Sequence, residues 1–127
     1  MYREAIIERY KFPRRKGVLQ KADAQAEVVN SLCGDEIVLY MKLDEGRVQV
    51  ADARFDGQGC ALTLASADLL CENVIGKSLT ELQKITADYV LALYGEMPSP
   101  SRLKCVLLPY EALKMSLQLI RIKKQEL

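Results

Sequence analysis

The stretch EIVLYMKLDEGRVQVADARF, residues 36–55, decides the fold of this chain. In its first half, apolar residues occupy every second position: Ile37, Leu39, Met41 and Leu43. This period of two is typical of a strand with one buried face. The turn residues Asp44-Glu45-Gly46 lead into a second strand, where Val48 and Val50 fall out of phase with Phe55, which indicates a β-bulge. The stretch therefore predicts an antiparallel hairpin of strands near 36–44 and 47–55.

Two further elements are predicted before the hairpin. A short N-terminal helix is indicated by apolar residues at helical spacing: Tyr2, Ala5, Ile6 and Tyr10. Pro13 ends this helix, and residues 11–17 form a basic loop, which is either a partner contact or a solvated charge run. A strand near 25–31 follows.

Helices are predicted after Cys60. Residues 61–75 are apolar around most of the helix circumference, as in a buried helix, and a capping box at 78–81 begins one further helix. The inner stripe of that helix is Leu79, Leu82, Ile85, Tyr89 and Leu93. Residues 95–102 form a loop, and a last helix begins near Cys105 with Pro109 in its first turn. The fold class is α+β: a three-stranded antiparallel sheet with a short N-terminal helix and helices packed on one face, in a single domain over residues 1–127.

The composition excludes several function classes. The 18 basic and 17 acidic side chains give a net charge of +1, which offers no electrostatic basis for binding nucleic acid or an anionic membrane. The apolar runs are too short to span a bilayer, and the start Met1-Tyr2-Arg3-Glu4 lacks the pattern of a signal peptide. We therefore expect a cytoplasmic protein whose 4 cysteines are reduced thiols.

Three cysteines stand in distinctive contexts: Cys33-Gly34-Asp35, Gly57-Gln58-Gly59-Cys60 and Arg102-Leu103-Lys104-Cys105. A hairpin centred on Glu45 places position 33 opposite position 57, so the first two motifs emerge at the same end of the sheet. The third cysteine is predicted just before a helix, where the helix dipole favours a thiolate. Cys71, by contrast, lies inside the apolar helix and is predicted to serve core packing.

Three thiolates and one carboxylate, in a chain with 0 histidines, suit tetrahedral zinc or a small iron–sulfur cluster. A permanently held cluster uses about four thiolates, so a centre with three thiolates and a weaker oxygen donor favours release. Asp35 is the nearest candidate for that fourth donor, unless its carboxylate serves to cap the loop. The pattern also leaves open three unrelated buried thiols, or a small domain whose zinc is purely structural.

The same residues resemble the U-type iron–sulfur scaffold family, which comprises IscU, SufU and the N-terminal domain of NifU. The segment from Tyr10 to Gly17 is similar to the family's Tyr-x-Asn-Pro-Arg-Asn-x-Gly, and Gly76-Lys77-Ser78-Leu79 to the linker between its helices. The three cysteine motifs resemble the ligand motifs of the family in the same order.

The resemblance implies that Cys33, Asp35, Cys60 and Cys105 bind metal, with Cys105 and Cys33 as candidate persulfide acceptors. It implies a scaffold and carrier on which a transient 2Fe–2S cluster is assembled from iron and from sulfur supplied by a cysteine desulfurase, then passed to apo acceptor proteins. Zinc is expected in the resting protein. The resemblance favours an assembly scaffold and sulfur acceptor that works with a cysteine desulfurase over an enzyme in its own right, and it leaves this question open. The second function found within the family is that of a zinc-bound sulfurtransferase of SufU type, which accepts persulfide.

Three departures from the family pattern matter. Lys104 replaces the histidine that precedes the third cysteine in IscU-type members, so we expect Lys104 and Arg102 to modulate the thiols without binding metal. Arg102-Leu103-Lys104-Cys105 resembles the Arg-x-Lys-Cys of SufU-type members, but the chain lacks room for their insertion before it. Finally, Ser99-Pro100-Ser101-Arg102 replaces the Leu-Pro-Pro-Val-Lys chaperone signal, so the sequence does not predict chaperone dependence.

Overall fold

The computed structural model describes residues 3–126, with the side chains of 4–122. Its elements run α1 (Arg3–Lys11), β1 (Ala24–Asn30), β2 (Asp35–Leu43), β3 (Val50–Gln58), α2 (Ala61–Val74), α3 (Leu79–Gln83), α4 (Ala87–Tyr94) and α5 (Pro100–Glu126). The three strands form one antiparallel sheet in the order β1-β2-β3. The predicted α+β fold class is confirmed. Tyr2, which is predicted to belong to the first helix, lies outside the described residues.

The central strand β2 fixes the inner face of the sheet. Its alternating residues Ile37, Leu39, Met41 and Leu43 are all buried. The β2–β3 register shifts between Lys42, which faces Asp52, and Leu43, which faces Val50. This leaves Ala51 as the extra residue and confirms the predicted bulge.

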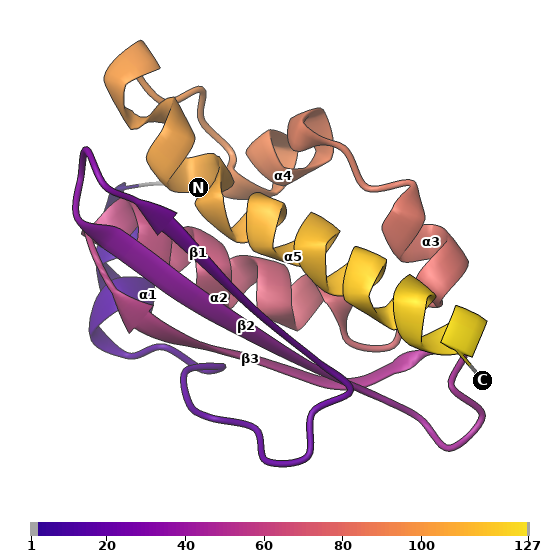
Figure 1. The fold of residues 1–127 in the computed structure, drawn as a ribbon. Helices are drawn as coiled ribbons and strands as arrows, with labels where there is room; N and C mark the ends of the chain where they lie inside the picture. The colour runs from indigo at the N-terminus through magenta and orange to yellow at the C-terminus, as the bar shows by residue number, and fades with distance from the viewer. Residues whose placement is uncertain (1–2, 127) are drawn as a thin grey trace.

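The helices cover one face of the sheet (Figure 1). The long helix α5 packs on β1 and β2, while α2 packs on β3 and against α5. Between them lies a core of fully buried side chains that includes Ile37, Met41, Phe55, Leu70 and Leu113. This packing brings the end of the sheet where β2 begins, the start of α2 and the first turns of α5 together at one edge.

One predicted helix is in fact two. The sequence predicts a continuous helix after the capping box, and the box is present: the Ser78 hydroxyl accepts from the Glu81 N–H, and the Glu81 carboxylate accepts from the Ser78 N–H. However, α3 ends at Gln83 and α4 begins at Ala87. Thr86 starts the second helix, because its hydroxyl accepts the N–H of Tyr89 at 3.2 Å and offers the backbone a new N-cap. Of the expected stripe, Leu82 and Ile85 are buried.

The last helix begins earlier than the sequence predicts. It starts at Pro100, so Pro109 lies inside it and not in its first turn. The carbonyl of Ser99 accepts the N–H groups of Arg102 and Leu103 at 2.9 and 3.0 Å, and proline at the first helical position loses nothing by lacking an N–H. Inside the helix, Pro109 cannot donate to the carbonyl four residues back, which is that of Cys105.

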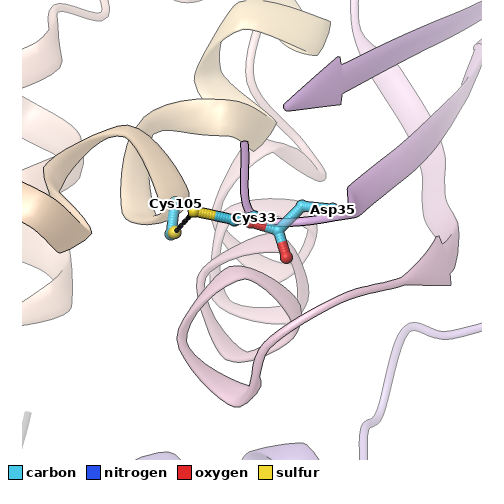
Figure 2. Close-up of side chains that lie close together, drawn as sticks. All are labelled: Cys33, Asp35 and Cys105. Carbon is cyan, nitrogen blue, oxygen red and sulfur yellow. Dashed lines mark hydrogen bonds between the residues drawn. The ribbon is translucent and has the colours of Figure 1, made fainter. Parts of the chain in front are cut away.

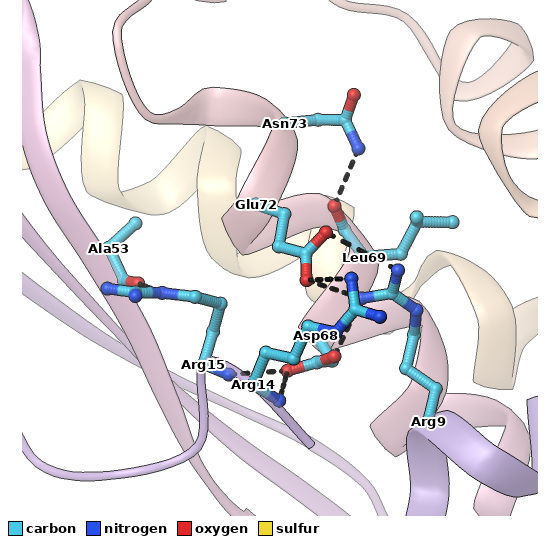
Figure 3. A network of polar contacts seen from close by, with 8 residues as sticks. All are labelled: Arg9, Arg14, Arg15, Ala53, Asp68, Leu69, Glu72 and Asn73. Atoms are coloured by element: carbon cyan, nitrogen blue, oxygen red, sulfur yellow. Dashed lines mark hydrogen bonds and ion pairs between the residues drawn. The ribbon is translucent and has the colours of Figure 1, made fainter. Parts of the chain in front are cut away.

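The basic loop is fastened to the fold by a buried carboxylate (Figure 3). Asp68, on α2, is fully buried and accepts the backbone N–H groups of Arg14 and Arg15 at 2.9 and 2.7 Å. It also pairs with the Arg9 guanidinium at 2.7 Å, which anchors α1. Glu72, one turn along α2, pairs with Arg9 at 3.0 Å. The loop is therefore more than a solvated charge run, because its backbone is held at Asp68.

Candidate metal centre

The first predicted donor, Cys33, lies in the four-residue loop between β1 and β2. Asn30 and Asp35 pair at the ends of the two strands, and the loop residues 31–34 are all exposed. Gly34 completes the turn with φ = +70°, a left-handed conformation that glycine adopts without strain. Cys33 is therefore presented at the surface.

Asp35 begins β2 and is fully buried. One of its carboxylate oxygens accepts the backbone N–H of Cys60 at 2.8 Å, and the other accepts the hydroxyl of Thr63 at 3.1 Å. Both donors belong to the start of α2, where a negative charge is favoured by the helix dipole. Asp35 thus joins the first cysteine motif to the second.

The glycine before Cys60 makes this junction possible. Gly59 has φ = +156°, and a Cβ at this position would overlap the Asp35 carboxylate. Gly59 therefore lets the backbone before Cys60 pass close to the Asp35 carboxylate. Cys60 itself is half-buried at the N-cap of α2, and its Sγ lies 3.3 Å from the Thr63 hydroxyl.

Cys105 comes from the second turn of α5 and is fully buried. The prediction that it precedes a helix, where the dipole favours thiolate, is therefore wrong. Burial raises the pKa of its thiol to about 12, and the hydrogen bonds with Cys33 and Asp35 and the nearby Cys60 act in the same direction. The residue next to Cys105 holds this part of α5 in place. The Val106 carbonyl accepts a hydrogen bond from the Ser66 hydroxyl on α2 at 2.7 Å.

Two thiols and a carboxylate meet at this edge of the fold (Figure 2). The Cys105 thiol donates to the Cys33 sulfur, with 3.6 Å between the two Sγ atoms. A ligand atom from each of Cys33, Asp35 and Cys105 lies within 4.8 Å of the others. Tetrahedral zinc with Zn–S bonds of about 2.3 Å separates two thiolate sulfurs by about 3.8 Å. The spacing of the sulfurs and the chemistry of the donors therefore fit such an ion with little movement.

The structure places Cys60 beside this group, with its thiol turned to Thr63. The hairpin prediction places Cys60 at the correct end of the sheet, but the predicted pairing register of the two strands is wrong. Gly57 lies opposite Ile37 and not opposite Cys33. The turn is longer than predicted, because an Asp44 carboxylate oxygen accepts the N–H groups of Val48 and Gln49 and holds residues 44–49 in a wider loop.

The remaining residues that the sequence singles out lie outside this group. Cys71 is fully buried in the main core, as predicted, and burial raises the pKa of its thiol. Lys104 is exposed and lines a groove of about 450 Å³ between residues 29–32 and α5. Arg102 is exposed two residues before it.

Two functional residues, Thr63 and Ser66, were not predicted from the sequence. Thr63 binds the carboxylate and Ser66 holds the helix that carries Cys105. Both are buried polar residues on α2, as is Asp68. That pattern alone signals buried hydrogen-bond partners, although it does not name them.

Comparisons with known proteins agree with this fold. The family model of the NifU-like N-terminal domain matches residues 1–126. The zinc-dependent sulfurtransferase SufU of Bacillus subtilis is 35% identical over 131 residues, covering 90% of this chain and 87% of the relative. The iron–sulfur cluster assembly scaffold protein IscU of Thermotoga maritima is 33% identical over 136 residues, covering 94% of each. Among solved structures, the N-terminal part of a NifU-like protein from Brucella abortus has a TM-score of 0.76 at 28% identity, covering 96% of this chain and 95% of that one.

The fold is that of a U-type iron–sulfur assembly protein. The chain belongs to the NifU-like N-terminal domain family, which confirms the resemblance seen in the sequence. Within residues 3–126, none of the helices combines the length and apolar character needed to cross a bilayer.

Proposed function

We propose that residues 1–127 act as one domain that scaffolds and carries a transient 2Fe–2S cluster. Iron and desulfurase-derived sulfur are its substrates, and apo iron–sulfur proteins receive the product. Cys33, Asp35, Cys60 and Cys105 are the proposed ligands. The observation that carries the proposal is the approach of the Cys33 and Cys105 sulfurs to 3.6 Å beside a buried carboxylate.

The exposure of the donors supports release of the cargo. Cys33 is exposed on a loop, whereas Asp35 and Cys105 are fully buried. An acceptor protein can reach the centre from the Cys33 side without opening the core. Cys60 joins the set by rotation of its side chain, since it is half-buried at a helix N-terminus and held through its backbone. Lys104 and Arg102 lie next to the third cysteine and modulate its access to partners.

A second candidate is a zinc-bound sulfurtransferase that accepts persulfide from a cysteine desulfurase. Two observations favour it: the 35% identity with a zinc-dependent sulfurtransferase, and a donor set of cysteines and a carboxylate in a chain with 0 histidines. In this second candidate, zinc occupies the same donors, and Cys33 or Cys105 takes up the sulfane sulfur.

Anaerobic reconstitution with iron, cysteine and a cysteine desulfurase separates the candidates. A scaffold develops the visible absorption of a 2Fe–2S cluster and transfers it to an apo-ferredoxin. A sulfurtransferase instead keeps stoichiometric zinc, stimulates desulfurase turnover and carries persulfide without forming a cluster. Retained zinc with neither cluster nor persulfide would contradict both candidates and leave a structural zinc domain.

A further inference from the structure

The contact between the exposed and the buried cysteine allows a reaction that metal binding does not explain. The Cys33 and Cys105 sulfurs are 3.6 Å apart, close to the separation of about 3–3.5 Å from which reacting atoms proceed. We propose that Cys105 reduces a persulfide carried on Cys33, so that the chain itself converts sulfane sulfur into sulfide. This inference rests on the proposed acceptance of sulfur by the scaffold.

The difference in exposure assigns the two roles. Cys33 stands on an exposed loop, where a donor protein can deliver a sulfur atom. Cys105 is fully buried beneath it, so in this conformation it is shielded from the donor and faces only its neighbours in the centre. Sulfur therefore arrives at Cys33, with Cys105 already in contact behind it.

The loop that carries Cys33 has room to move its sulfur closer to Cys105. Cys33 is tied to its neighbours by a long backbone hydrogen bond to the Asn30 carbonyl, at 3.3 Å. An added Cβ on Gly34 would meet no atom within 4 Å, which shows open space beside the turn. Cys105, by contrast, is fixed on a helix. A shift of the loop alone therefore closes the gap toward the roughly 2.05 Å of a sulfur–sulfur bond.

The proposed step balances without a further reductant. The Cys105 sulfur attacks the Sγ of the Cys33 persulfide, forming a Cys33–Cys105 disulfide while the bond from Cys33 Sγ to the sulfane sulfur breaks. The thiol proton of Cys105 passes to the outer sulfur of the ionised persulfide, and this sulfur leaves as HS⁻. The sulfane sulfur gains two electrons, and the two cysteine sulfurs supply them. A low-molecular-weight thiol must then reduce the disulfide before a second round.

Other thiols are less well placed for the attack. The Cys60 sulfur contacts the Thr63 hydroxyl at 3.3 Å and lies outside the group of Cys33, Asp35 and Cys105, whose ligand atoms are all within 4.8 Å of one another. Cys71 lies in the main core, away from the centre. Cys71→Ala is therefore a matched control that removes a buried cysteine without touching the proposed reaction.

The test is a single-turnover experiment on the metal-free protein. The chain is mixed anaerobically with a cysteine desulfurase and cysteine, quenched over time by alkylation, and analysed by non-reducing peptide mapping and a sulfide assay. In the wild type and in Cys71→Ala, persulfide on the Cys33 peptide should decay as a Cys33–Cys105 disulfide and a burst of sulfide appear. Cys105→Ser should keep its persulfide and release sulfide at least about tenfold more slowly, since it lacks the adjacent nucleophile.

The outcomes separate this inference from the function on which it rests. Persulfide that persists on wild-type Cys33 with no disulfide overturns the inference and leaves sulfur acceptance intact. Equal sulfide release from Cys105→Ser also overturns it. Absence of persulfide and disulfide from every variant overturns the proposed sulfur acceptance and the inference together. Because the wild-type time course follows both species, the result does not depend on the folding of Cys105→Ser.

Discussion

Asp35 has two separable roles, and a pair of substitutions distinguishes them. Its carboxylate accepts the Cys60 N–H at 2.8 Å and the Thr63 hydroxyl at 3.1 Å, and it also lies within 4.8 Å of both the Cys33 and the Cys105 sulfur. The first role is structural and the second is that of a proposed ligand. Asp35→Ala removes both, whereas Asp35→Asn keeps the first and weakens the second.

The expected stability changes follow from the hydrogen bonds. In Asp35→Ala the part-buried Cys60 N–H loses the carboxylate that accepts it, and an unpaired buried donor costs about 1–3 kcal/mol. In Asp35→Asn the amide oxygen still accepts this N–H, and the amide nitrogen donates to the Thr63 hydroxyl, which can also accept. We therefore expect a loss of about 2 kcal/mol for Asp35→Ala and below about 1 kcal/mol for Asp35→Asn in urea unfolding of the metal-free protein.

Metal affinity should not follow the same order. A neutral amide oxygen is a poorer zinc donor than a carboxylate, so both variants should lose zinc affinity by at least about tenfold in titrations against a competing chelator. An assembled cluster should also leave both variants more slowly in transfer to an apo-ferredoxin, because the exchangeable oxygen donor is gone. Unchanged zinc affinity and unchanged transfer in Asp35→Asn would refute ligation and leave Asp35 as the acceptor that holds α2.

Three further predictions concern the cysteines and Lys104. Alanine at Cys33, Cys60 or Cys105 should each abolish stoichiometric metal or cluster binding, while Cys71→Ala should retain it and lose at most about 2–3 kcal/mol of core packing; comparable metal loss in Cys71→Ala would contradict the ligand set. Lys104→Arg should keep zinc affinity and slow persulfide uptake, whereas loss of zinc would indicate a nitrogen ligand. Because burial raises the pKa of Cys71 above its usual 9.0, its thiol stays protonated in the fold but ionises in the unfolded chain. The contribution of the Cys71 thiol to the free energy of unfolding is complete below about pH 9, and above that pH it is lost at about 1.4 kcal/mol per pH unit. Urea midpoints measured from about pH 8 to 10 should therefore decline less steeply in Cys71→Ala than in the wild type.

The sequence predicts the sheet well because its pattern records which face is buried. The alternation from Ile37 to Leu43 is the buried face of β2, and the phase change in the next strand is the observed bulge at Ala51. The helix boundaries are harder to predict, since two local signals compete. Pro109 can mark a helix start, but the Ser99–Pro100 pair already begins α5 nine residues earlier.

The candidate site could be predicted as a set of residue types but not as a network. The motifs name the four proposed donors, yet the bonds that hold these residues join positions far apart in the chain, such as Asp35 with Thr63 and Ser66 with Val106. Local spacing carries no information about such pairs. Asp68 is a signal of the same kind, because an acidic residue among the buried apolar residues of a helix must find partners, and here it holds Arg9 and the basic loop.

The centre combines rigid and movable donors, and this combination follows from where each donor sits. Cys105 lies on a 27-residue helix that Ser66 ties to α2, and Asp35 is held by two donors from the start of α2. Cys33 alone occupies an exposed loop with space around its glycine. A permanent site gains from rigidity at every ligand, because mobility in one of them opens a path for the ion to leave. A carrier gains from the opposite arrangement, in which buried donors define the site and one exposed donor exchanges with a partner. The distribution of burial among these residues thus supports a centre that holds its cargo briefly and passes it on.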